Sequence, residues 1–227
     1  MVVLFDVDRT LLSGNCTAAL AKALASAGVV PRSAVASLAV QQLLYRLKRR
    51  SFPALMGRTY RLIQGCEITR VEECAERVVH DVIAPTIYPE AAARIAMHRG
   101  RGDQVVLASA APAVVIERVA RCVGVSAVLA TEFERIGPRF GPVKAPPAYG
   151  AGKLELAGRA GLLDAGPPHV YTDHAEDWAM VLVSGFATFV NPTAQVIQDA
   201  RRHGIAHEVV RWGDAPRFSS MLSPLDR

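Results

Sequence analysis

The chain has 227 residues, of which 51% are apolar and 21% charged, and its formal net charge is +5. This length and composition fit one domain with a substantial insertion and exclude a globally disordered chain, because enough apolar side chains are present to form a packed core. The mild positive charge agrees with an anionic substrate or an acidic surface, but it is also common in proteins that bind neither.

Cysteine usage and hydropathy indicate where the protein works. The four cysteines show no CxxC pair and no metal-binding spacing with histidine, which predicts free thiols in a reducing compartment. The chain opens directly on an apolar strand, without the basic and apolar regions of a signal peptide. No apolar run reaches the roughly 18 residues of a membrane-spanning helix. We therefore expect a soluble, cytoplasmic protein.

The first residues combine a predicted strand with two carboxylates. Residues 2–5 form a continuous apolar run, typical of a strand buried on both faces of a parallel sheet, and Asp6, Asp8 and Thr10 follow. Side chains two residues apart on an extended chain point the same way, so both carboxylates emerge at the strand's carboxyl end, where open sheets bind ligands. Two adjacent carboxylates repel, and Mg²⁺ suits such a pair. The alternative is a polar turn in which Asp8 or Thr10 caps a helix.

Residues 15–88 are predicted to be helical almost throughout, with helices over 17–26, 33–50, 53–63 and 69–82. The last begins near a pattern like a capping box, formed by Thr69 and Glu72. Nothing in this span predicts a strand. We interpret it as an all-helical cap, residues 15–88, inserted into a core made of residues 1–14 and 89–227.

From residue 89 onward, predicted helices and strands alternate. The helices cover 90–100, 113–123, 153–160, 178–183 and 193–203, and the strands cover 104–108, 127–130, 169–172 and 187–190. Residues 133–147 are rich in glycine and proline and are interpreted as a loop or hairpin. This alternation predicts an α/β core with a parallel sheet.

Polar side chains stand at further strand ends and helix starts, namely Ser109, Lys153, and Asp173 with Asp177. If the strands are parallel neighbours, these side chains converge with Asp6 and Asp8 at one edge of the sheet. Such a set suits a carboxylate nucleophile that attacks phosphorus, with a second carboxylate as general acid and base.

The remaining members of this set would bind the phosphoryl group and a metal ion. Ser109 and the N–H of Ala110 would bind phosphoryl oxygens, Thr10 is a further phosphate-binding candidate, and Lys153 would offset negative charge. Asp173 and Asp177, with Asp6, would hold Mg²⁺. Each residue also has a simpler interpretation. Ser109 or Asp173 would cap a helix, Asp177 would be a first-turn acid and Lys153 would be solvated. His174 would be either a general base or simply an exposed loop residue. The order and spacing of the whole set favour catalysis.

Four motifs resemble the haloacid dehalogenase superfamily of aspartate-nucleophile phosphatases: FDVDRTLL, VVLASAAP, GKLELAG around Lys153, and VYTDHAEDWAM. The long helical insertion is similar to the phosphoserine phosphatase-like branch. The resemblance covers residues 1 to about 205, with the cap matching only in length and helicity. It implies an α/β fold, a Rossmann-like parallel sheet core with helices on both faces, plus the inserted all-helical cap domain.

The resemblance also implies a Mg²⁺-dependent phosphomonoester hydrolase with Asp6 as nucleophile and Asp8 as acid and base. Ser109 and Lys153 would bind phosphate. Asp6, the backbone carbonyl of Asp8, and Asp173 would ligate the metal, and Asp177 would support that site.

The sequence departs from the family pattern at three places. Arg9 stands where the family usually carries a small residue, and its guanidinium would either reach a substrate anion or pair with a neighbouring acid. Asn15 stands where true phosphoserine phosphatases carry a glutamate that reads the substrate's amino group, which disfavours phosphoserine. Thr172 and His174 flank Asp173, where the family often has glycine and a small residue.

The span 31–61 carries seven basic residues and no acidic one; they are Arg32, Arg46, Lys48, Arg49, Arg50, Arg58 and Arg61. It would be a lip that attracts an anionic substrate or a phospholipid surface, or simply a solvated helix face. A nucleic-acid patch is disfavoured because few aromatic residues interleave with the charges.

We expect a small phosphorylated metabolite as substrate, read in part by Arg9, Asn15 and Arg58. A lipid-phosphate phosphatase or a phosphotransferase of the same fold stays an alternative. A non-catalytic binding module is disfavoured, because every position that the chemistry needs is filled. The sequence does not indicate an oligomeric state.

Overall fold

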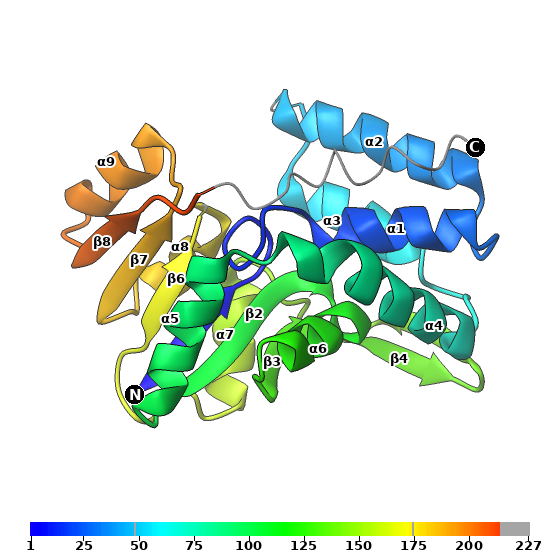
Figure 1. Ribbon diagram of the computed structural model, residues 1–227. Helices are drawn as coiled ribbons and strands as arrows, with labels where there is room; N and C mark the ends of the chain where they lie inside the picture. Colours follow the sequence, from blue (N-terminus) through cyan, green and yellow to red (C-terminus); the bar gives the residue numbers. More distant parts are fainter. Residues whose placement is uncertain (48, 174, 214–227) are drawn as a thin grey trace.

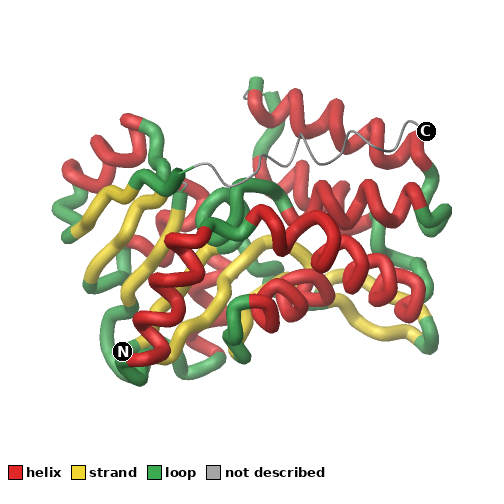
Figure 2. The backbone as a smooth tube through the Cα atoms, viewed as in Figure 1, coloured by secondary structure: helices red, strands yellow, loops and turns green. Residues whose placement is uncertain are grey.

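A computed structural model describes residues 1–47, 49–173 and 175–213 and shows a twisted sheet covered by helices (Figures 1 and 2). The sheet has six strands in the order β3-β2-β1-β6-β7-β8, and every neighbouring pair is parallel. The strands are β1 (Val2–Asp6), β2 (Gln104–Pro112), β3 (Ala127–Thr131), β6 (His169–Thr172), β7 (Phe186–Val190) and β8 (His207–Val210). The central strand, β1, therefore ends at Asp6 between the ends of β2 and β6.

The apolar run of β1 is buried on both faces of the sheet. Val3 and Phe5 pack with α5 (Pro89–Gly100) and α6 (Ala113–Cys122), whereas Val2 and Leu4 pack with α7 (Ala151–Arg159), α8 (Trp178–Val181) and α9 (Ala194–Arg202). Alternate strand residues point to opposite faces, so a sheet covered on both sides needs this unbroken apolar sequence. Figure 1 shows α5 and α6 in front of the sheet and α7 behind it. The predicted α/β fold with helices on both faces is confirmed.

The segment between β1 and α5 is helical and lies over the strand ends (Figure 1). It comprises α1 (Cys16–Ser26), α2 (Arg32–Arg46), α3 (Phe52–Arg61), α4 (Ile68–Val78), a π-helical turn (Val79–Ile83) and a 3-10 turn (Ala84–Thr86). Leu20 of α1 and Val71 of α4 share one hydrophobic cluster with the sheet face that carries Phe5. No helix within the described residues has the length and apolarity to cross a membrane.

Two strands differ from the sequence prediction. β2 does not stop at Ala108 but continues to Pro112, because it pairs with β3 at Ser109 and, past a bulge, at Pro112. Strand β8 was not predicted, because its four residues are only partly buried and pair along the sheet edge, so they lack a continuous apolar run. The proline-rich segment takes the hairpin alternative, with β4 (Phe133–Ile136) antiparallel to β5 (Arg139–Val143).

Most helix boundaries differ from the prediction by two residues or fewer, and two larger features of the cap were predicted wrongly. The predicted capping pattern of Thr69 and Glu72 is wrong, because α4 begins at Ile68 after Glu67 and no side chain caps it. The hairpin accepts one N–H of the first turn of α4 instead, because Ile68 N donates to the Pro138 carbonyl over 2.9 Å. The second predicted helix, over 33–50, ends at Arg46.

Candidate active site

The loop after β1 is a tight turn that begins at Val7. The Val7 carbonyl accepts the N–H groups of Leu11 (2.9 Å) and Leu12 (3.1 Å), which folds the chain back beneath the strand end. Arg9 adopts φ +66°, the left-handed region that strains residues other than glycine. Its Nε lies 3.1 Å from Asp173 Oδ2, so of the two roles weighed for Arg9, the structure shows the pairing with an acid.

Lys153 joins two carboxylates beneath this turn. Its Nζ donates to Asp6 Oδ1 over 2.8 Å and to Asp177 Oδ1 over 2.6 Å, and its side chain is only 3% exposed. Asp177 Oδ2 accepts the Thr172 hydroxyl over 2.9 Å. The solvated interpretation of Lys153 is therefore excluded. Both oxygens of Asp177 are engaged in these bonds, so this residue orients the lysine.

The backbone before α7 makes this burial of the lysine possible. Lys153 is the third residue of α7, which follows Gly150 with φ +53°. A Cβ atom at Gly152 would lie 2.0 Å from the Pro147 carbonyl oxygen, so only glycine permits this close turn. The two glycines thus bring the first turn of α7 against the end of β1.

Burial sets the protonation of these groups. Burial favours the neutral amine, but the Asp177 and Asp6 carboxylates outweigh it and raise the pKa of Lys153, which stays charged. Burial also raises the pKa of Asp6, with Lys153 acting against it and Asp177 and Asp173 adding to it. Burial, opposed by Arg9 and reinforced by Asp177, raises the pKa of Asp173 to about 6. The carboxylates at this edge outnumber the cations that face them.

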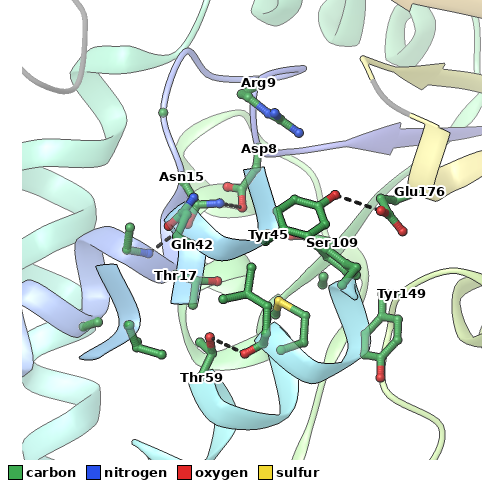
Figure 3. A pocket seen from close by; sticks show the side chains of 18 of the residues that line it. Asp8, Arg9, Asn15, Thr17, Gln42, Tyr45, Thr59, Ser109, Tyr149 and Glu176 are labelled. Atoms are coloured by element: carbon green, nitrogen blue, oxygen red, sulfur yellow. Dashed lines mark hydrogen bonds between the residues drawn. The ribbon is translucent and has the colours of Figure 1, made fainter. Parts of the chain in front are cut away.

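Asp8 belongs to a separate hydrogen-bonded group. Its Oδ2 accepts Asn15 Nδ2 over 2.9 Å, and its Oδ1 accepts the N–H of Cys16 over 2.8 Å (Figure 3). Asn15 Oδ1 in turn accepts the Ala18 N–H over 2.8 Å and so caps α1. Burial raises the pKa of Asp8, which favours a carboxyl group that holds a proton until it is needed. This double role of Asn15 was not predicted from the sequence, although an asparagine before an alanine-rich helix is a known cap signal.

The end of β2 is fixed by a buried network that the sequence did not reveal. The Ala110 carbonyl accepts the hydroxyls of Tyr60 (2.8 Å) and Thr131 (3.0 Å), which come from α3 and β3. Ser109 lines the cavity described below, and its Oγ accepts the N–H of Ala111 over 3.1 Å. These bonds fix the peptide between Ala110 and Ala111, directly after Ser109. No linear motif signals them, because Tyr60 and Thr131 lie far away in the sequence.

A cavity of about 570 Å³ lies between the strand ends and the cap helices (Figure 3). Its lining includes, of the candidate residues, Asp6, Asp8, Arg9, Asn15, Ser109, Ala110, Lys153, Asp173 and Asp177. Tyr45 of α2 crosses it and donates to Glu176 Oε1 of the core over 2.9 Å. The structure therefore brings most of the predicted set to one cavity.

Two predicted residues lie elsewhere. Thr10, a phosphate-binding candidate, is fully buried beneath the turn and does not line the cavity. Its Oγ1 has no hydrogen-bond partner in the described part of the chain. Arg58, a specificity candidate, is exposed on α3 and points away from the lining, because the buried side of that helix is formed by Leu55, Met56, Thr59 and Tyr60. Neither is positioned to contact a ligand there.

No basic residue of the 31–61 span whose side chain the structure describes lies in the cavity lining. Arg32, Arg49 and Arg61 are exposed like Arg58, and Arg50 is half-buried. Lys48 and His174, both noted in the sequence, lie outside the described residues. This placement fits the solvated face better than a lip around the cavity.

The donor set at the strand ends fits a hard divalent cation. Among the residues that the structure describes, no three His, Cys, Asp or Glu side chains already form a metal-binding cluster. However, besides burial, neighbouring carboxylates make both Asp6 and Asp173 harder to ionise. Asp177 and Asp173 raise the pKa of Asp6, and Asp177 and Asp8 raise that of Asp173. A divalent ion at this edge would offset that repulsion. One or two carboxylates with room for phosphate and water is the environment that Mg²⁺ prefers. Asp6 and Asp173 are therefore suitable side-chain ligands.

Comparison with known proteins shows the family. Residues 3–181 match the family of haloacid dehalogenase-like hydrolases. A probable phosphatase of Mycobacterium tuberculosis is 26% identical over 206 residues, which cover 88% of this chain and 72% of that protein. A phosphoserine phosphatase of the same organism is 28% identical over 209 residues, covering 88% of this chain and 68% of that one.

Solved structures show the same fold. A protein of unknown function from Bordetella pertussis superimposes with a TM-score of 0.80 at 22% identity, covering 91% of this chain and 96% of that chain. A phosphoserine phosphatase, solved as an analogue of its phospho-aspartyl intermediate, has a TM-score of 0.66 at 16% identity and covers 94% and 93% of the two chains.

Proposed function

The chain belongs to the haloacid dehalogenase-like hydrolases, and on that premise we propose that it is a Mg²⁺-dependent phosphatase. It hydrolyses a small phosphomonoester through an aspartyl-phosphate, with Asp6 as the nucleophile. Residues 15–88 form the cap over this reaction, and the protein works in the cytoplasm. Its similarity to a probable phosphatase supports the reaction class.

The first half of the proposed reaction forms the covalent intermediate. One oxygen of Asp6 attacks phosphorus while the bond between phosphorus and the substrate's alcohol oxygen breaks. Asp8 donates its proton to that oxygen, so the alcohol leaves neutral. Ser109 and the Ala110 N–H bind the phosphoryl oxygens, and Lys153 offsets charge on both Asp6 and the phosphoryl group.

The second half releases phosphate. Asp8, now ionised, takes a proton from a water molecule, whose oxygen attacks phosphorus and frees the Asp6 carboxylate. When bound, Mg²⁺ held by Asp6, the Asp8 backbone carbonyl and Asp173 supplies positive charge that lets one anion approach another. Asp177 acts through Lys153, which it orients.

The observation that supports this proposal most is the arrangement of Asp6, Lys153 and Asp8. A buried ammonium lies 2.8 Å from the carboxylate at the end of the central strand, and a second carboxyl with a raised pKa lines the same cavity. Burying charge costs desolvation free energy, and groups with perturbed pKa values in a cavity are typical of functional sites.

Phosphate release from a panel of phosphomonoesters, measured with Mg²⁺ and with EDTA, tests the proposal. We expect release with Mg²⁺ only, and a loss of at least about a thousandfold in Asp6→Asn, because the nucleophile is removed. Asp164→Asn is the matched control, because Asp164 is exposed and lies outside the cavity lining. Release that survives EDTA or the Asp6→Asn change would overturn the proposal.

A further inference from the structure

The cavity has two chemically different ends. The end at the sheet carries the charged residues described above. The opposite end is formed by α1, α2 and α3 and is mainly apolar, with Ala18, Ala21, Val35, Leu38, Ala39, Phe52, Leu55 and Met56 in its lining. The whole volume, about 570 Å³, is within the range of about 300–1,000 Å³ found for small-molecule sites and exceeds what a phosphoryl group needs.

Several hydrogen-bonding groups at or near the apolar end are engaged by the protein itself. Asn15 binds Asp8 and the Ala18 N–H. The Thr59 hydroxyl donates to the Leu55 carbonyl over 3.0 Å, and the Tyr45 hydroxyl donates to Glu176. Thr17 and Gln42 are uncharged, and Lys22 is exposed. A polar substrate group that entered this end would lose its water and find few partners.

The three cap helices that line the cavity also offer no negative charge. Residues 9–66, which include all of α1, α2 and α3, contain no Asp and no Glu. The acids in the cavity lining come from β1, its loop and the segment after β6, and apart from Glu176 they belong to the proposed chemistry. Glu176 accepts the Tyr45 hydroxyl. An ammonium group on the substrate would therefore enter an apolar region without a carboxylate of α1, α2 or α3 to pair with.

We propose that the substrate is the phosphomonoester of an apolar alcohol, an alkyl or aryl phosphate that carries no ammonium group. This inference rests on the proposed function and adds the class of substrate. The phosphate lies at the sheet edge, and the apolar group packs among Val35, Leu38 and Phe52 of the cap. Each methylene that leaves water on binding raises affinity by up to about fourfold.

A series of soluble straight-chain monoalkyl phosphates, from ethyl to octyl, tests this. We expect kcat/KM to rise with chain length until the apolar end is full, and phosphoserine and phosphoethanolamine to be poorer than butyl phosphate. If Asp6-dependent release favours phosphoserine or phosphoethanolamine, or does not vary with chain length, this inference is overturned while the phosphatase proposal stands. If no ester shows Asp6-dependent release, both fail.

Calorimetric binding of alkylphosphonates gives a second readout that does not depend on turnover. Octylphosphonate is expected to bind at least tenfold more tightly than ethylphosphonate. Leu38→Asn should reduce this ratio, because Leu38 lines the cavity. Leu43→Asn is the matched control on the same helix, since Leu43 is 56% exposed and outside the lining. Equal ratios in the two variants would overturn the assignment of the apolar group to this end.

Apolar phosphomonoesters occur both as free amphiphiles and as lipids in a bilayer. Release from octyl phosphate without release from phosphatidate in phosphatidylcholine vesicles would support a free ester. Release from both would support the same apolar group presented by a membrane.

Discussion

The two ends of the cavity differ in what stabilises them. We call the charged end at the sheet the floor, and the apolar end formed by α1, α2 and α3 the roof. On the floor, buried charges are fixed by short bonds, as in the contacts of Lys153 with Asp6 (2.8 Å) and Asp177 (2.6 Å). On the roof, α2 and α3 present half-buried apolar side chains such as Val35, Leu38 and Phe52. Among the described residues that line the cavity, the Tyr45–Glu176 bond joins α2 to the core. Bond-making chemistry needs preorganised charge, whereas selection of an alcohol group needs only a surface of the right shape and polarity.

The largest expected effect comes from Lys153→Met, which removes the central cation of the floor. Asp6 and Asp177 would be left buried and uncompensated, which costs about 3–5 kcal/mol of unfolding free energy. We also expect kcat/KM to fall by about 10²–10³-fold. Denaturant unfolding and phosphate release measure the two effects.

Lys144→Met is the control for this change. Lys144 also contacts a carboxylate over 2.8 Å, in Glu132, but both side chains are more than half exposed. An exposed pair of this kind contributes about 1 kcal/mol or less. If the two variants lost equal stability, burial of the charge would not be what distinguishes the floor.

Asn15 lies between the floor and the roof, and Asn15→Ala should have an intermediate effect on both stability and kcat. It removes both the cap of α1 and a hydrogen bond to Asp8, so we expect a loss of about 1 kcal/mol in stability and about tenfold in kcat. Thr193→Ala is the control. Thr193 Oγ1 accepts the Val196 N–H and caps α9, and Thr193 does not line the cavity. The substitution should cost stability without changing kcat. A kcat that is unchanged in Asn15→Ala would show that this residue serves the helix alone.

The smallest effect is expected for Tyr45→Phe, on the roof. The variant loses the hydrogen bond to Glu176, which contributes about 1 kcal/mol to holding α2 against the core. We therefore expect KM for a long alkyl phosphate to rise by about two- to fivefold, with kcat nearly unchanged. Burial, with help from Glu176, raises the pKa of Tyr45 to about 12, so the hydroxyl remains a donor throughout pH 6–10. The effect of the variant should therefore not vary over that range. Glu176→Gln keeps an acceptor for the hydroxyl and should change KM less.

The same contrast explains what the sequence could predict. The floor was predictable because buried parallel strands have continuous apolar sequences, and the residues that follow such strands meet at one edge of the sheet. Asp6, Ser109, Lys153 and Asp173 all line the cavity for that reason. Lys153 alone suggested a solvated side chain, and only its place in the set indicated otherwise.

What the sequence did not predict depends on contacts between distant segments. Strand β8 and the extension of β2 exist because a neighbouring strand pairs with them. The bonds of Tyr60 and Thr131 to the Ala110 carbonyl join three elements. Thr10 was assigned to phosphate from its place in the motif, but the turn at Val7 directs it into the core. The periodicity of apolar residues and the spacing of motifs do not indicate such contacts between distant segments.

The identity of the covalently modified residue tests the central claim most directly. The protein is mixed with Mg²⁺ and an excess of octyl phosphate, or of whichever ester of the panel turns over fastest, quenched in acid during the first turnovers and analysed by peptide mass spectrometry. We expect a phosphoryl group on Asp6, which is absent in Asp6→Asn. A phosphoryl group on Ser109, or sustained turnover without any acyl-phosphate on Asp6, would contradict it.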